Sequence, residues 1–139
     1  MVAQLKPLKT HRVLVVEDNE HVAYMLDFML QRAGYDVIAV GNGRDAQAAI
    51  ENIEPVDVVL LDLMLPYVSG YQLIEEIRDD AKWQYVPIIV LSGKVLEEDI
   101  VQALDLGAND YVTKPFRPEE LLARMRRIVA DSERRMVGR

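Results

Sequence analysis

One stretch of the sequence decides the fold: PVDVVLLDLMLP, residues 55–66. Between its two prolines, residues 56–61 form a nearly continuous apolar run that is rich in valine. Such a short run predicts a strand buried on both faces, as in the centre of a parallel sheet. Its carboxyl end carries Asp62 into a loop, where a carboxylate is costly unless it is paired, hydrogen-bonded or bound to metal. Since ligands of open α/β sheets bind at the carboxyl ends of the strands, Asp62 is either part of a functional site or a simple loop cap.

The pattern of a strand followed by a helix repeats five times along the chain. The predicted strands cover residues 11–16, 35–40, 56–61, 87–92 and 110–113. Apolar residues at helical spacing predict five helices: one that begins within 17–20 and stops at Gly34, others marked by 46–53, 73–77 and 97–106, and a last one that begins at Pro118 and runs through Val129. This alternation predicts an α/β fold in which helices cover both faces of a parallel sheet through right-handed crossovers.

Length and composition predict one soluble domain. The 139 residues suffice for a single core, and the absence of cysteine excludes disulfides and thiolate chemistry. We expect the domain to span residues 11–130, with a lead-in at 1–10 and a polar tail or linker at 131–139. No apolar run approaches the roughly 18 residues that a membrane span needs, so we expect a cytoplasmic protein without membrane contact.

The charge of the chain is acidic but unevenly distributed. A net charge of −7 argues against direct nucleic-acid binding. From Arg124 to the end, however, six arginines face only Asp131 and Glu133. This basic end is either a partner-binding or nucleic-acid-binding tail or, as we favour, solvated charge at a helix end.

Charged or hydroxyl side chains follow four of the five predicted strands. They are Glu17 and Asp18 after the first strand, Asp62 after the third, Ser92 at the end of the fourth and Lys114 after the fifth. Three clustered carboxylates with oxygen-only ligands suit a hard divalent ion such as magnesium. A carboxylate nucleophile, a metal, a lysine and a hydroxyl together predict phosphoryl transfer. Taken singly, each residue also has a plain interpretation as a helix start, a local cap or a solvated lysine.

Four segments of the chain resemble the receiver domain of the two-component response-regulator family. They are residues 13–18, residues 59–66 with Gly70, residues 90–93 and residues 107–116, and the resemblance covers about 11–130. It implies a flavodoxin-like, doubly wound, five-stranded parallel sheet with five helices and strand order 2-1-3-4-5.

The resemblance also assigns roles to the strand-end residues. Asp62 would be the phosphoacceptor, taking its phosphoryl group from a sensor histidine kinase or a histidine phosphotransfer protein. Magnesium would be held by Glu17, Asp18, Asp62 and the main-chain carbonyl of Met64. Glu17 stands where aspartate is commoner, which we expect to change the reach of this ligand and not the binding itself.

Three further residues would act on the phosphoryl group or respond to it. By the resemblance, Lys114 contacts the group and precedes a cis Lys114–Pro115 bond. Ser92 binds a phosphoryl oxygen, and Tyr111 swings inward behind it. From the residues alone, we would favour a half-buried strand aromatic without a switching role for Tyr111.

The implied function is a phosphorylation-dependent signalling switch, not a turnover enzyme. The state of Asp62 would reach a downstream effector or output domain through the face of the fourth helix, the fifth strand and the last helix. A phosphorylation-dependent homodimer through this face is one option, since Asp110 and Arg124 match a charge pair of the winged-helix branch. Ile100 replaces an arginine of that branch, and Ile100 and Leu106 are either contact residues or core residues.

Two other functions remain open at this point. The first is an aspartyl-phosphate phosphohydrolase, which would need a second acid two residues after the nucleophile. Met64 occupies that position, so the sequence argues against this enzyme. The second is a receiver-like binding module that never takes phosphate, which the retention of all five strand-end side chains argues against.

Overall fold

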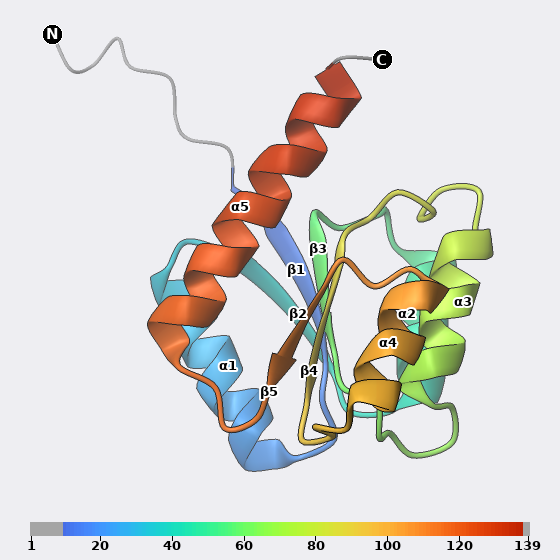
Figure 1. Cartoon of the computed structure of the whole chain (residues 1–139). Coiled ribbons are helices and arrows are strands. Elements are labelled where there is room, and N and C mark those ends of the chain that lie inside the picture. Colours follow the sequence, from blue (N-terminus) through green and yellow to red (C-terminus); the bar gives the residue numbers. More distant parts are fainter. Residues whose placement is uncertain (1–9, 138–139) are drawn as a thin grey trace, which may run out of the picture.

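The structure is a computed structural model that describes residues 10–137, in which strands and helices alternate along the chain (Figure 1). The expected lead-in at 1–10 therefore lies almost entirely outside the described residues. The strands are β1 (Arg12–Val16), β2 (Asp36–Val40), β3 (Val58–Leu61), β4 (Ile88–Ser92) and β5 (Asp110–Thr113). The helices are α1 (Glu20–Arg32), α2 (Gly43–Asn52), α3 (Gly70–Asp79), α4 (Glu97–Leu106) and α5 (Pro118–Val137).

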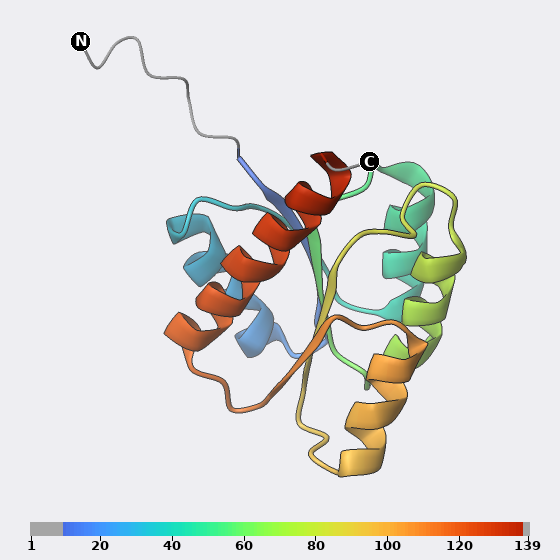
Figure 2. The ribbon, with the colours of Figure 1, turned by 45° about the horizontal axis from the view of Figure 1, so that its top comes forward.

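The strands form one parallel sheet in the order β2-β1-β3-β4-β5. Helices α1 and α5 cover one face, and α2, α3 and α4 cover the other (Figures 1 and 2). The predicted fold class, strand order and number of elements are thus confirmed. Because all five strands are parallel, their carboxyl ends lie at one edge of the sheet.

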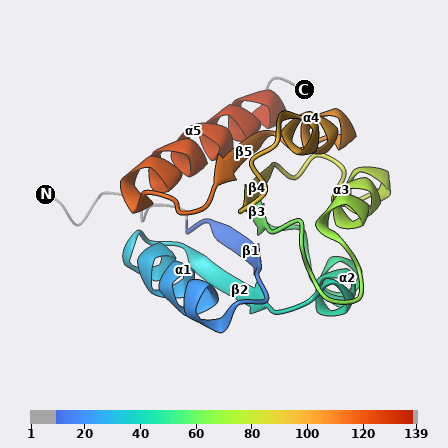
Figure 3. The same ribbon diagram turned by 60° about the horizontal axis from the view of Figure 1, so that its bottom comes forward.

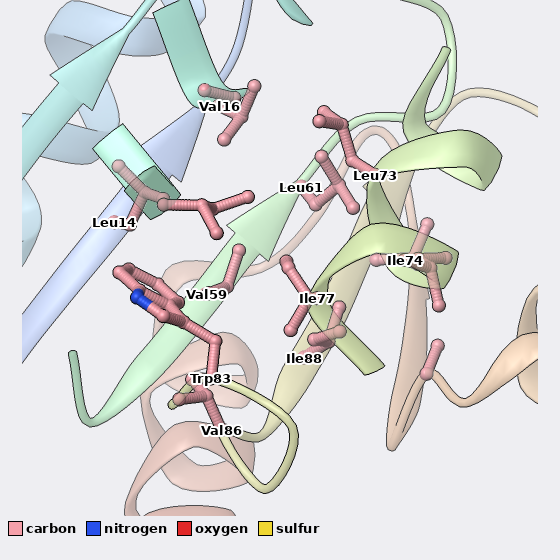
Figure 4. Packing of buried hydrophobic residues seen from close by; sticks show 14 of the residues in the cluster. Leu14, Val16, Val59, Leu61, Leu73, Ile74, Ile77, Trp83, Val86 and Ile88 are labelled. Carbon is pink, nitrogen blue, oxygen red and sulfur yellow. The ribbon is translucent and has the colours of Figure 1, made fainter. Parts of the chain in front are cut away.

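Each face of the sheet has its own hydrophobic core, as the alternation of side chains along a strand requires. Alternate residues of β1, β3 and β4 pack under α2, α3 and α4, together with the fully buried Trp83 (Figure 4). The remaining strand residues pack against Leu26 and Leu30 of α1 and against Leu121, Met125 and Val129 of α5. Residues 58–61 are buried on both faces, which explains why this part of the sequence is continuously apolar.

Helix α2 begins earlier than the first apolar residue of its pattern because of a cap and a close contact. The Asn42 side chain accepts a hydrogen bond from the Asp45 N–H at 2.8 Å, so the helix starts at Gly43. A Cβ atom at Gly43 would lie 2.3 Å from the carbonyl oxygen of Val68. The sequence Gly41-Asn42-Gly43 is therefore a helix start that touches the loop after β3, and not only a break.

Helix α5 continues through Val137, well past Val129, where its apolar periodicity weakens. Figure 1 shows its last turns projecting beyond the amino edge of the sheet. Near the body of the protein, His11 Nε2 lies 3.3 Å from Glu133 Oε2. Residues 131–137 of the expected tail or linker are thus helical. Among residues 10–137, no helix combines the length and the apolar character that crossing a membrane requires.

An arginine clamp ties together two loops at the amino edge of the sheet. Arg78, in the last turn of α3, donates to the carbonyl of Gly107 at 2.7 and 3.0 Å and to those of Val86 and Gln84 at 2.7 and 3.1 Å. It also donates to Asn109 Oδ1 at 2.8 Å. The guanidinium group thereby satisfies main-chain carbonyls that helices and strands leave unpaired.

We expect Arg78→Ala to lower the free energy of unfolding by about 2–4 kcal/mol, since part-buried carbonyls lose their donors at once. Denaturant unfolding with and without the substitution measures this change. Arg127→Ala, which removes an exposed arginine from α5, is the matched control and should change stability by less than about 0.5 kcal/mol. Equal stability of the Arg78 and Arg127 variants would show that the clamp does not hold the loops.

Candidate functional site

The candidate site lies at the carboxyl edge of the sheet, which Figure 3 brings forward. Strands β1 and β3 are neighbours, with Val16 opposite Leu61. The next residues, Glu17 and Asp62, therefore leave the sheet side by side. Their main chains are fixed as well: Glu17 N–H donates to Val40 O and Asp62 N–H to Val16 O, each at 3.1 Å.

Three carboxylates gather at this edge. Each of Glu17, Asp18 and Asp62 offers an oxygen, and these oxygens lie within 4.8 Å of one another. Glu17 and Asp62 are only 3% and 7% exposed, whereas Asp18 faces solvent. The structure thus brings together the three acids that the sequence predicted to share a site.

Lys114 lies between the two buried carboxylates. Its Nζ is 2.5 Å from Glu17 Oε1 and 2.8 Å from Asp62 Oδ2. Burial alone would lower the pKa of Lys114, but the hydrogen bonds to Asp62 and Glu17 outweigh burial and raise it. Burial raises the pKa of Glu17 in spite of the ammonium beside it. The Lys114–Pro115 peptide bond is cis, as the resemblance implies.

The loop after β3 folds back on Asp62 and fixes its second oxygen. Asp62 Oδ1 accepts a hydrogen bond from the Met64 N–H at 3.2 Å. The chain then turns tightly enough that a Cβ atom at Gly70 would lie 2.3 Å from the Asp62 carbonyl oxygen. Glycine at residue 70 therefore permits this close return. The Met64 side chain itself is 63% exposed.

Ser92 and Tyr111 meet at Lys94, in the loop between β4 and α4. The Lys94 N–H donates to Ser92 Oγ at 3.3 Å, and the Lys94 carbonyl accepts from the Tyr111 hydroxyl at 2.7 Å. Tyr111 is half-buried and packs against the core under α4, and its burial raises its pKa. The described position of Tyr111 is therefore an inward one.

The face of α4, β5 and α5 carries the residues considered for dimerisation. Arg124 pairs within the chain, 3.0 Å from both Asp110 Oδ2 and Glu120 Oε1. Leu106 packs against the core, and Ile100 is partly buried. Both apolar residues thus fall between the two interpretations, neither fully exposed contacts nor fully buried core.

Sequence reasoning missed two groups that shape the site. Asn19 caps α1 through its side chain, and its N–H donates to Glu17 Oε2 at 3.1 Å. The sequence already placed Asn19 in the helix-start cluster 17–20, and what it did not indicate is the bond to Glu17. Tyr71 and Asp99 hydrogen-bond across α3 and α4 at 3.2 Å, and no local pattern in the sequence links them.

The donor set fits a hard divalent cation. All three side chains offer carboxylate oxygens, the ligand type that magnesium prefers. Lys114 supplies one positive charge against three carboxylates, so the remaining negative charge would be balanced by a divalent cation. The arrangement differs from zinc sites, which in proteins favour histidine and cysteine ligands.

Comparisons with known proteins agree with this geometry. A family model described as response regulator receiver domain matches residues 13–126. The DNA-binding response regulator MtrA of Mycolicibacterium smegmatis is 44% identical over 115 residues, which cover 83% of this chain and 49% of MtrA. The alkaline phosphatase synthesis transcriptional regulatory protein PhoP of Bacillus subtilis is 41% identical over 122 residues, covering 88% of this chain and 50% of PhoP. This chain therefore spans about half the length of these two relatives.

A solved structure matches nearly the whole described fold. It is the receiver domain of the sensor histidine kinase PA1611 from Pseudomonas aeruginosa, with a magnesium ion coordinated in its active-site cleft. The TM-score is 0.81 at 34% identity, and the match covers 88% of this chain and 99% of that one. The family match, the relatives and the shared fold lead to one conclusion: this chain belongs to the receiver domains of two-component response regulators.

Proposed function

We propose that Asp62 accepts a phosphoryl group from a sensor histidine kinase or a histidine phosphotransfer protein. The observation that carries this proposal is the position of its carboxylate. One oxygen is 2.8 Å from the Lys114 ammonium and the other accepts the Met64 N–H at 3.2 Å. The carboxylate is thus held in one orientation at the carboxyl edge of the sheet, as a nucleophile requires.

The transfer itself is a substitution at phosphorus. An oxygen of Asp62 forms a bond to the phosphorus atom while the P–N bond of the phosphohistidine breaks, and the leaving imidazole takes up a proton from water. Lys114, which now pairs with the carboxylates, would turn to the oxygens of the incoming group, and the Ser92 hydroxyl would donate to one of them. These residues supply orientation and charge neutralisation, on which phosphoryl transfer depends most.

Magnesium is the cation that this site would hold, through Glu17, Asp18, Asp62 and, by resemblance, the Met64 carbonyl. The three carboxylates support the side-chain part of this set, and the magnesium in the related PA1611 domain adds to it. When bound, the ion supplies positive charge to the carboxylates and to the transferred phosphoryl oxygens.

Two alternatives are less well supported. An aspartyl-phosphate phosphohydrolase would place an acid at residue 64 to protonate the leaving group, and the exposed thioether of Met64 cannot donate a proton. A module that never takes phosphate would gain nothing from three carboxylates gathered at one edge of the sheet, because they repel one another. We therefore favour a switch that is modified once per signal over an enzyme that turns over substrate.

The functional unit would be residues 11–130, and its state would be read on the face of α4, β5 and α5. Ser92 ends β4 and Tyr111 lies on β5, so both connect the site to this face. A downstream effector or an output domain would be the reader. MtrA is named a DNA-binding response regulator and PhoP a transcriptional regulatory protein, and each extends beyond the half that this chain matches. Such an additional part would be one kind of reader.

The first prediction concerns the phosphoacceptor. With magnesium and acetyl phosphate, the intact mass should rise by one phosphoryl group, and Asp62→Asn should abolish the rise because the amide is a poor nucleophile. Asp105→Asn, which removes an exposed acid from α4, is the control and should be phosphorylated as fully as the native sequence. Equal modification of the Asp62 variant would assign the nucleophile to another residue.

The second prediction concerns the metal. Magnesium at ten times its dissociation constant should stabilise the native chain by about 1.4 kcal/mol, since it binds the folded state selectively. Thermal unfolding with and without magnesium measures this effect, and Asp18→Ala should lose most of it. Glu20→Ala, at the exposed start of α1, should keep it. If Asp18→Ala were stabilised as strongly as the native sequence, Asp18 would not be a ligand.

The third prediction concerns self-association. Beryllofluoride serves here as a mimic of the phosphoryl group on Asp62. If the face of α4, β5 and α5 forms a homodimer in the phosphorylated state, this mimic should raise the mass measured by light scattering toward twice that of the monomer. The exposed Val101 and Leu104 of α4 favour this contact, whereas the internal pairing of Arg124 opposes it. A strict monomer at high concentration with and without beryllofluoride would remove the homodimer and leave a different protein as the reader.

A further inference from the structure

We infer that Asp99 is a positioning residue of the switch: it anchors the β4–α4 loop in the place where Lys94 holds Tyr111 inward. This inference rests on the proposed phosphorylation of Asp62. It adds a side chain of α4 and one of α3 to the residues that respond to the phosphoryl group.

The Asp99 carboxylate joins three parts of the structure. The same oxygen, Oδ1, lies 3.2 Å from the Tyr71 hydroxyl of α3 and 3.7 Å from the Lys94 ammonium of the loop. The side chain of Asp99 is only 18% exposed, and that of Lys94 is 34% exposed. Partial burial strengthens such a pair relative to one that water fully screens.

Asp99 differs in this respect from the other acids of its helix turn. Glu97, Glu98 and Asp99 all lie in the first turn of α4, where negative charge interacts favourably with the helix dipole. Glu97 and Glu98 point to solvent, whereas Asp99 points back to α3 and the loop. All three acids therefore share the favourable interaction with the helix dipole. Of the three, Asp99 is the one that contacts Tyr71 and Lys94.

Tyr71 completes the anchor from the α3 side. Burial and the neighbouring Asp99 raise the pKa of Tyr71 to about 12, so its hydroxyl stays protonated and donates. The Lys94 ammonium also lies 5.8 Å from the centre of the Tyr71 ring, within the range of a cation–π contact. Lys94 is thus held from two sides, by a carboxylate and by an aromatic face.

The main chain of Lys94 carries this anchoring to the switch residues. Its N–H donates to Ser92 Oγ and its carbonyl accepts from the Tyr111 hydroxyl. Ser92 Oγ accepts here, and its hydroxyl still carries a hydrogen that can be donated to a phosphoryl oxygen. Fixing the Lys94 side chain through Asp99 therefore favours the loop position in which Tyr111 is bonded inward.

The consequence is a shift in the balance between two loop positions. If phosphorylation selects the position with Tyr111 inward, a residue that stabilises this position raises the affinity for a phosphoryl mimic. Asp99→Asn removes the charge that holds Lys94 while it keeps a similar shape. We expect it to weaken the binding of beryllofluoride by about three- to tenfold, the usual size of coupling between contacting side chains.

Calorimetric titration of the chain with beryllofluoride in saturating magnesium measures this affinity. Glu98→Gln is the matched control, because it removes the same charge from the same helix turn without touching Lys94 or Tyr71; its affinity should remain within twofold of the native value. Thermal unfolding without beryllofluoride should show that both variants are folded. Affinity of Asp99→Asn equal to or above that of the native chain would overturn the inference.

A second set of variants tests the route through Lys94. In a Lys94→Met background, Asp99→Asn should have less than half of its effect in the native background, because the ammonium that it holds is gone. The same loss in both backgrounds would contradict the anchor. Failure of the native chain to bind beryllofluoride, or undiminished binding by Asp62→Asn, would instead count against the proposed function itself.

Discussion

Two carboxylates buried side by side at one edge of the sheet, Glu17 and Asp62, are the constraint on which the rest of the structure depends. Buried carboxylates are costly unless they are paired and hydrogen-bonded. Lys114 meets this need from the far end of the sequence, with its Nζ 2.5 Å from one carboxylate and 2.8 Å from the other. With Asp18 nearby, the charge remains negative overall. A divalent cation would balance this charge, and together with Lys114 it would offset the negative charge of an incoming phosphoryl group.

The fold serves this charge arrangement by fixing main chains on both sides of it. The parallel register of β1 and β3 sets Glu17 beside Asp62, and the close return at Gly70 holds the loop against the Asp62 carbonyl. The Arg78 clamp secures loops at the opposite edge, away from the chemistry. The β4–α4 loop is different, because side chains of α3 and α4 determine its position. A switch needs such a contrast between a fixed site and one element that can change place.

The sequence was sufficient for the parts of this arrangement that depend on local patterns. The ends of α4 and β5 coincide with the prediction, since Gly107 stops one element and a short β-rich run defines the next. The strand-end acids and Lys114 were predicted to meet because parallel strands present their carboxyl ends together. The start of α2 was left open by the apolar pattern, because Asn42 caps a helix whose first residues are not apolar.

What escaped prediction depends on tertiary contacts between distant residues. Nothing near Arg78 in the sequence indicates that it would reach Gly107 and Asn109, and nothing near Asp99 indicates Tyr71.

The most direct test of the central claim is to locate the modified residue: phosphorylate the chain, reduce the acyl phosphate with borohydride and map the peptides by mass spectrometry. We expect reduction to convert residue 62, and no other acid, to homoserine. Conversion at Asp18 or at Glu17 (to the corresponding longer alcohol), with residue 62 intact, would contradict the account.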